Sequence, residues 1–152
     1  MLNNISRLFL TTALAAATVL AQSNNPLGQR IAGSWLVSIT LDGAATPFAV
    51  DMATFHDDGS MTVIASDRGE SNAVGSYRRA GNREFNSTHT HVLYNPDGTF
   101  AGIAKVIGLF RLSDTADTFA GRYRVEVSTA AGIVVAKVTG VITGKLVAPE
   151  TL

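Results

Sequence analysis

Apolar and polar residues alternate along most of the chain after Gly33, with a period of two residues rather than the longer period of a helix. This alternation places every second side chain on one face of a β-strand, so these segments are predicted to be strands buried on one side. Eight strands are expected, at residues 34–41, 48–56, 60–66, 73–79, 83–94, 99–112, 118–128 and 133–146.

Short turn sequences separate these strands. Asp57-Asp58-Gly59 and Asn95-Pro96-Asp97-Gly98 are typical of tight hairpins, and the segments 80–82 and 129–132 are similar to them. Strands joined by short turns pair as antiparallel neighbours, and closing the sheet removes its exposed edges. The predicted fold class is therefore all-β, with a single eight-stranded antiparallel up-and-down (meander) β-barrel over residues 33–148.

The inner face of the barrel is predicted from the last three strands, where one set of alternating positions is apolar and the other carries the charges. The inward set is Phe100, Gly102, Ala104, Val106, Gly108, Phe110, Leu112, Phe119, Gly121, Tyr123, Val125, Val127, Val134, Ala136, Val138, Gly140, Ile142 and Leu146. Many of these residues are small. Small side chains leave room for a ligand, or they let the strands coil around a packed core, and the pattern allows both interpretations.

The fifth predicted strand brings polar side chains to the inner face. Phe85 and Leu93 are expected to point inward, and the alternation then carries His89 and His91 with them. Tyr77, in the fourth strand, is expected on the same face. The second strand is ambiguous, because either of two alternating sets can face inward: Phe48, Val50, Met52 and His56, or Ala49, Asp51, Ala53 and Phe55.

His89-Thr90-His91 is the sharpest chemical feature of the sequence. Residues two apart on a strand lie on one side, about 7 Å apart along the backbone. Two such imidazoles can chelate a metal ion if His56 or Asp51 supplies a further ligand. They can also act as acid and base, because histidine titrates near neutral pH, or simply hydrogen-bond to water and neighbours.

The segment from Leu27 to Trp35, which ends in Gly33-Ser34-Trp35, resembles the short turn and Gly-x-Trp that open the first strand of lipocalins and related calycin barrels. This resemblance implies that Trp35 closes one end of the barrel beneath a ligand cavity. The predicted strand order is equally similar to the allene oxide cyclase and dirigent-like barrels. Those barrels also have eight strands and an apolar pocket, and they imply guidance of a reactive substrate rather than transport.

Residues 1–21 have the pattern of a signal peptide. Arg7 precedes an apolar run from Leu8 to Leu20, and Val19-Leu20-Ala21 places small residues at a cleavage site. Residues 22–32 are then a lead-in to the barrel. The mature protein is expected to be secreted or periplasmic and to have no membrane span, since the apolar run is shorter than the roughly 20 residues that a bilayer requires.

Composition narrows the classes of function. The 12 Lys and Arg residues equal the 12 Asp and Glu residues, so there is no positive surplus for binding nucleic acid. The chain has no cysteine, which excludes disulfides, zinc-thiolate sites and cysteine nucleophiles. It also lacks Gly-x-Ser-x-Gly, His-Glu-x-x-His and a phosphate-binding glycine loop, so no organic cofactor is expected.

These observations predict an exported barrel that binds a small apolar or amphipathic molecule in its interior. The expected ligand contacts are Trp35, Tyr77, Phe85, His89, His91, Phe100, Phe110, Tyr123, Val125 and Val138. The alternative is a cofactor-free isomerase, cyclase or lyase that uses the same cavity, with His89 or His91 as base and Tyr77 as proton donor. A metal-dependent activity at His89 and His91 is a further possibility.

Overall fold

A computed structural model describes residues 30–150, and these residues form eight β-strands without a helix. The strands are β1 (Gly33–Leu41), β2 (Ala49–Phe55), β3 (Ser60–Ile64), β4 (Ala73–Gly81), β5 (Glu84–Tyr94), β6 (Phe100–Leu112), β7 (Thr118–Ser128) and β8 (Val134–Leu146). Each observed bound lies within two residues of the predicted range. The predicted all-β fold class is confirmed.

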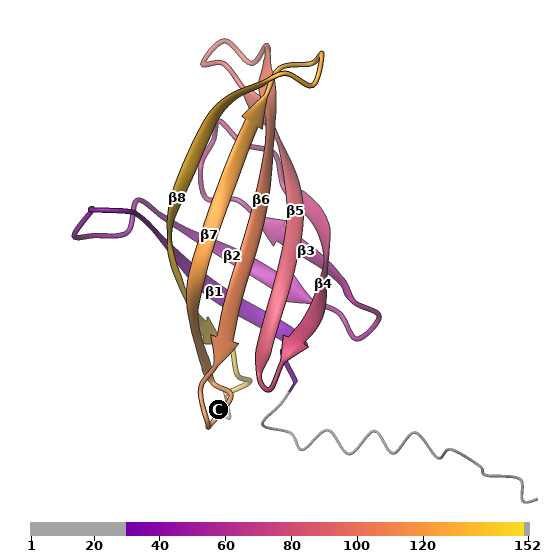
Figure 1. Ribbon diagram of the computed structural model, residues 1–152, viewed down its shortest axis with the longest axis vertical. Helices are drawn as coiled ribbons and strands as arrows, with labels where there is room; N and C mark the ends of the chain where they lie inside the picture. Colours follow the sequence, from indigo (N-terminus) through magenta and orange to yellow (C-terminus); the bar gives the residue numbers. More distant parts are fainter. Residues whose placement is uncertain (1–29, 151–152) are drawn as a thin grey trace, which may run out of the picture.

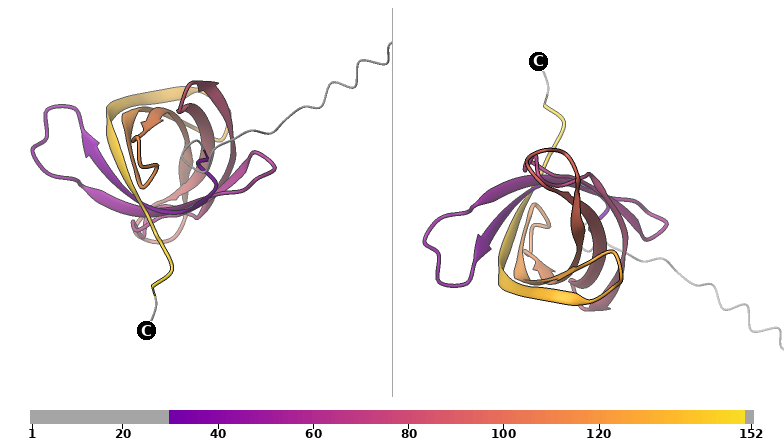
Figure 2. Two further views of the ribbon diagram at one scale, coloured as in Figure 1. Left: turned by 90° about the horizontal axis from the view of Figure 1, so that it is seen from below. Right: turned by 90° about the horizontal axis from the view of Figure 1, so that it is seen from above.

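The strands form one closed barrel in which each strand pairs antiparallel with the next. β8 returns to pair with β1, from Trp35 opposite Leu146 to Leu41 opposite Gly140. Figure 1 shows the long strands β5 to β8 rising beside the shorter β1 to β4. The two end views in Figure 2 show the strands curling into a ring, so the predicted meander is complete and leaves no unpaired edge.

The predicted signal peptide, residues 1–21, lies outside the described residues, as does most of the lead-in. The predicted barrel range, 33–148, contains all eight strands. Within the described part of the chain, no helix has the length and apolar character needed to cross a membrane.

The hairpin turns have the local structure that their sequences predict. Gly59 and Gly98 adopt positive φ angles of 85° and 81°, a region that glycine enters without a steric penalty. Asp58 and Asp97 each accept a hydrogen bond from the backbone N–H two residues later, at 2.8 and 3.0 Å. In the turn between β4 and β5, Arg83 takes the positive φ angle, 60°, instead of a glycine.

The orientation of β2, which the sequence leaves open, follows the second of the two predicted sets. Asp51, Ala53 and Phe55 are buried, whereas Val50 and Met52 are exposed on the outer face. The outer neighbours of Met52 are also apolar, because it pairs with Leu36 on β1 and Ile64 on β3. Apolar residues on both faces of this part of the sheet explain why alternation alone does not orient β2.

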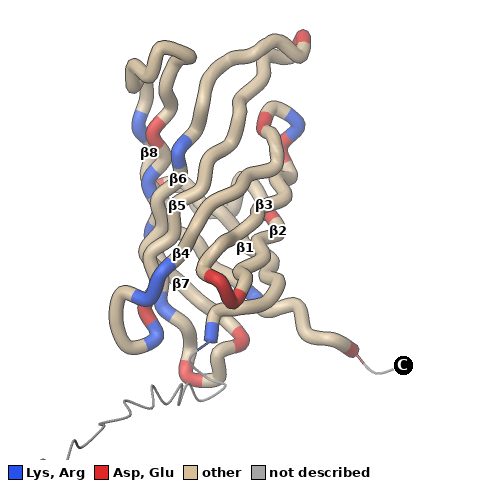
Figure 3. Tube along the Cα trace, turned by 90° about the vertical axis from the view of Figure 1, so that its right-hand side faces the viewer, with Lys and Arg blue, Asp and Glu red and all other residues tan. Residues whose placement is uncertain are grey.

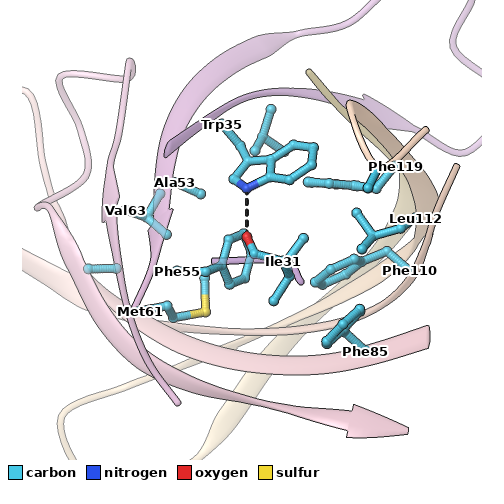
Figure 4. Packing of buried hydrophobic residues seen from close by; sticks show 13 residues of the cluster. Ile31, Trp35, Ala53, Phe55, Met61, Val63, Phe85, Phe110, Leu112 and Phe119 are labelled. Atoms are coloured by element: carbon cyan, nitrogen blue, oxygen red, sulfur yellow. Dashed lines mark hydrogen bonds between the residues drawn. The ribbon is translucent and has the colours of Figure 1, made fainter. Parts of the chain in front are cut away.

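A cluster of large apolar side chains fills one end of the barrel (Figure 4). Trp35 is fully buried at its centre and donates a hydrogen bond from Nε1 to the carbonyl oxygen of Ile31 at 2.8 Å. Phe119 packs on the indole at 5.1 Å between ring centroids, and Phe110 packs on Phe119 at 4.7 Å. The residues just before β1 thereby plug this end, which we call the closed end.

Glycines on β8 make room for aromatic rings from β7. Phe119 is paired with Gly144, and a Cβ atom built on Gly144 would lie 2.1 Å from the Phe119 ring. Tyr123 is paired with Gly140, and a Cβ atom there would lie 2.6 Å from the Tyr123 ring. The space beside these inward glycines is therefore occupied by aromatic rings rather than left empty. At the closed end, the ring of Phe119 is part of a packed core.

Replacing Trp35 tests the importance of the plug for stability. Trp35→Ala is expected to lower the free energy of unfolding by about 3–5 kcal/mol, because it removes the largest core side chain and leaves a cavity. Trp35→Phe is expected to cost less, about 1–3 kcal/mol, mainly because the Ile31 carbonyl loses its partner. Leu36→Ala, on the outer face of the same strand, should cost less than about 1 kcal/mol. Urea unfolding of the three variants measures these values, and equal losses at positions 35 and 36 would contradict the assignment.

Candidate functional site

A cavity of about 100 Å³ lies inside the barrel, next to the packed core of the closed end. Its apolar lining comes from β1, β2, β3, β6, β7 and β8 and from the residue just before β2. These residues are Val37, Ile39, Phe48, Ala49, Ala53, Met61, Val63, Ala104, Val106, Val125 and Ile142. Its polar lining is Asp51, Asp67, Glu70, Ser87, His89, His91 and Tyr123. An apolar cavity of about 150 Å³ holds one benzene molecule, so this smaller space suits a short alkyl chain.

His89 and His91 share the inner face of β5, as the alternation predicts, and both line the cavity. Their ring centroids are 5.1 Å apart, with an interplanar angle of 72°. Nδ1 of His89 is buried and has no hydrogen-bond partner within residues 30–150. Burial, with a smaller contribution from the charge of His91, lowers the pKa of His89 to about 3. His89 is therefore a neutral imidazole at neutral pH.

His91 is held by two groups from the loop between β3 and β4. Its Nδ1 lies 2.8 Å from the carbonyl oxygen of Ser71 and 3.6 Å from Oε2 of Glu70. A carbonyl oxygen only accepts hydrogen bonds, so Nδ1 of His91 carries the proton and donates a hydrogen bond to the Ser71 carbonyl. In the neutral ring Nε2 is then the nitrogen with a free lone pair.

The β3–β4 loop is tied to the end of β5, and this contact places Glu70 and Ser71 at the cavity. The backbone N–H of Ser71 donates to the carbonyl of Val92 at 2.8 Å, and the N–H of Val92 donates to Oγ of Ser71 at 2.9 Å. The N–H of Tyr94 donates to the carbonyl of Gly69 at 2.8 Å. The loop therefore acts as a short extra edge that covers one side of the cavity.

Three carboxylates, those of Asp51, Asp67 and Glu70, line the cavity together with His91. Asp51 is only 7% exposed, and its Oδ1 accepts hydrogen bonds from the backbone N–H and the hydroxyl of Ser66, at 2.9 and 3.1 Å. Burial is the main cause that raises the pKa of the Glu70 carboxyl; Asp51 and Asp67 raise it further, and His91 opposes them. The polar part of the cavity is thus acidic and partly removed from water.

Four of the ten predicted ligand contacts line this cavity: His89, His91, Tyr123 and Val125. Three others, Trp35, Phe85 and Phe110, belong to the packed core of the closed end. They lie outside the cavity because aromatic rings fill that end of the barrel completely.

The remaining three predicted contacts lie elsewhere in the barrel. Tyr77 packs edge-on against Phe55, and its hydroxyl donates to the carbonyl of His56 at 2.5 Å, away from the cavity. Phe100, the first residue of β6, is 46% exposed; Val138 is 37% exposed and is paired with Val125; neither residue lines the cavity. Tyr77 is therefore not placed to donate a proton to a molecule in the cavity.

The sequence does not identify Asp67, Glu70 and Ser71 as candidates. They lie in the β3–β4 loop, where no alternation predicts an orientation. The available signal is Asp51, a charged residue inside a largely apolar strand, which sequence analysis considers only as a metal ligand. Its burial requires hydrogen-bond donors from another segment, and Ser66 in this loop supplies them.

The metal interpretation of His89 and His91 depends on a third ligand. Across residues 30–150, no group of three or more His, Asp or Glu side chains is arranged to hold a metal ion. His56, one of the two residues considered for this role, is exposed just after β2, and Nδ1 of His91 is already bonded to Ser71.

The burial of His89 generates a pH prediction. Its pKa in the folded protein is below the ordinary value of 6.5, so its contribution to stability is complete above pH 6.5 and is lost as the pH falls toward 3. Glu70 acts in the opposite direction, so the effect is isolated by comparison with His89→Gln. We expect the variant to lose less stability between pH 7 and pH 5, by at most about 1.4 kcal/mol per pH unit. Urea unfolding at both pH values measures this difference; exposed His56→Gln is the control, and equal slopes for His89→Gln and the wild type would contradict the prediction.

Comparison with known proteins gives no assignment: no family model matches the chain, and no curated protein is similar to it. The closed eight-stranded antiparallel barrel is compatible with a lipocalin-like fold. The functional argument therefore rests on the geometry of the cavity and on the chemistry of its lining.

Proposed function

We propose that this protein is an exported small-molecule binding protein whose ligand, a small apolar or amphipathic molecule, occupies the barrel cavity. The observation that carries the proposal is a largely apolar cavity into which buried polar groups extend without partners. His89 Nδ1 and the Tyr123 hydroxyl line it, and neither has a hydrogen-bond partner in the described part of the chain. Export, to the periplasm or out of the cell, is inferred from residues 1–21.

Unpaired buried polar atoms support a ligand because they are unfavourable for folding alone. Leaving such an atom without a partner costs about 1–3 kcal/mol. Native proteins contain few of them, and many mark binding or catalytic sites. A ligand with a hydroxyl, carbonyl or amine group would supply the missing partner, while the apolar walls bury its hydrocarbon part.

The lipocalin-like interpretation is supported by the position of Trp35, which closes one end of the barrel beneath the cavity. Lipocalins and allene oxide cyclase-like barrels share this general shape, so the fold alone does not distinguish a carrier from an enzyme. The distinction depends on whether the cavity residues move protons.

Hexanol is a suitable first ligand, because its alkyl chain and its hydroxyl match the apolar and the polar parts of the lining. We expect a dissociation constant of about 1 mM or tighter, measured by NMR titration of cavity methyl groups. Ala104→Phe, which fills the cavity from β6, should weaken binding at least about tenfold, because the apolar chain loses its burial. Ala101→Phe, on the same strand but exposed, should have no effect.

Circular dichroism checks that both variants fold. If Ala104→Phe does not fold, nuclear Overhauser contacts between hexanol and the Val125 and Ile142 methyl groups of the wild type replace it. The absence of hexanol binding, or binding detected only outside the cavity, would overturn the proposal.

The second candidate function is proton transfer to and from carbon, as a cofactor-free isomerase, cyclase or lyase requires. The specific observation in its favour is the contact of His91 Nδ1 with the Ser71 carbonyl and Glu70, which leaves Nε2 as the nitrogen that can accept a proton from a substrate. His89, with a pKa of about 3, is too weak a base at neutral pH and would instead hydrogen-bond to the substrate.

Exchange of the α-protons of butanone in D₂O tests this activity, since butanone is a short-chain ketone and the exchange needs only a base. The base removes an α-proton to give the enolate, which then takes a deuteron at the same carbon. We expect the wild type to accelerate exchange about 100-fold over His91→Gln, as followed by loss of the α-proton NMR signal. His56→Gln should keep the wild-type rate, and a rate unchanged by His91→Gln would rule out catalysis by this residue.

A further inference from the structure

The charged side chains that line the cavity are all acidic. Asp51, Asp67 and Glu70 contribute carboxylates, and within residues 30–150 no lysine or arginine lines the same space. The nearest basic residue in sequence is Arg68, in the same loop, and it is exposed and does not line the cavity. The cavity therefore has a one-sided charge, although the chain as a whole is formally neutral.

The positive charges of the barrel lie on its outer surface. Figure 3 shows Lys and Arg spaced along β6, β7 and β8 and near the turn between β4 and β5. Several of them are paired there: Arg122 with Asp42 at 3.1 Å, and Arg124 and Lys137 with Glu126 at 3.4 and 3.6 Å. These cations do not compensate the carboxylates inside the barrel.

The acidic side of the cavity is suited to accept hydrogen bonds from a positively charged donor. Asp51 is only 7% exposed, and both hydrogen bonds from Ser66 go to Oδ1 rather than Oδ2. Across the same cavity, Tyr123 is only 5% exposed, and its hydroxyl is unpartnered in the structure's described range. A buried carboxylate is stable only when its charge and its lone pairs are met by partners.

We propose that the ligand of this cavity is a small protonated amine, with its ammonium group at Asp51 and Glu70 and its hydrocarbon part against the wall formed by Met61 and Val63. The inference rests on the proposed binding function and names the ligand class of that same site. An ammonium group can donate a hydrogen bond to the carboxylate of Asp51, and its positive charge relieves the repulsion between neighbouring carboxylates. A carboxylate ligand, such as a fatty acid, would place a negative charge next to these carboxylates and would be repelled.

The size of the cavity and the absence of a suitable ligand set for a metal both support an organic cation. About 100 Å³ accommodates a short alkyl chain. The described His, Asp and Glu side chains form no group that would hold a metal ion. An inorganic cation would make no use of the apolar walls, whereas an alkyl amine contacts both the polar and the apolar parts of the lining.

Hexylamine, hexanol and hexanoate test the proposal, because they share one chain and differ in the charge of the head group at pH 7. We expect hexylamine to bind the full-length protein at least about tenfold more tightly than hexanol, and hexanoate to bind at least about tenfold more weakly than hexanol, because desolvated charge pairs interact strongly. NMR titration of the cavity methyl groups gives the three dissociation constants under one set of conditions.

The variant Asp51→Asn with Glu70→Gln removes the proposed ammonium partners and retains acceptors for Ser66. In this variant hexylamine should bind within about threefold of hexanol, with hexanol itself unchanged, because the charge is lost and the apolar walls remain. Asp57→Asn with Glu150→Gln is the matched control: it makes the same two chemical changes at exposed positions and should retain the preference for the amine.

The possible outcomes distinguish failure of the amine proposal from failure of the binding function on which it rests. If hexanol binds but hexanoate equals or exceeds hexylamine, the amine proposal fails while the binding function stands. If the amine preference survives in the Asp51 and Glu70 variant, these carboxylates are not its cause and the proposal also fails. If none of the three compounds binds, the binding function itself is overturned.

Discussion

The hydrogen bond from the Trp35 indole to the Ile31 carbonyl, with the rings packed around it, closes one end of the barrel, and the rest of the structure depends on this closure. An eight-stranded barrel has an interior that side chains just fill, or that holds one small ligand. In this barrel both arrangements occur: side chains fill one end, and a cavity lies next to it. Large rings such as Phe119 and Phe110 fill the closed end, while Ala104 and Val106 leave space above it.

The strands and their order were predictable because they depend on local signals. Alternation defines each strand, and turn residues such as Gly59 and Gly98 define the hairpins with their positive φ angles. The inward direction of His89 and His91 follows from the same alternation on β5. The orientation of β2 did not follow, because Val50 and Met52 give its outer face an apolar character as well.

The candidate site was predictable only in part, because it depends on contacts between distant segments. No local pattern shows that the loop containing Glu70 and Ser71 pairs with the end of β5, since that contact depends on the tertiary fold. Predicted contacts such as Phe85 and Phe110 lie in the core for a similar reason. Alternation gives the face on which a side chain lies, but not the level along the barrel at which packing ends and the cavity begins.

The polar groups of the cavity are better explained by ligand recognition than by folding. A buried neutral imidazole at His89 and a buried carboxylate at Asp51 stabilise the barrel less than apolar side chains of similar size would. The aromatic rings of the closed end offset this cost, and none of them lines the cavity. Val37, Ala53, Met61 and Val63 pack in the same core and also line the cavity, so a change in this shared wall alters the core as well as the cavity.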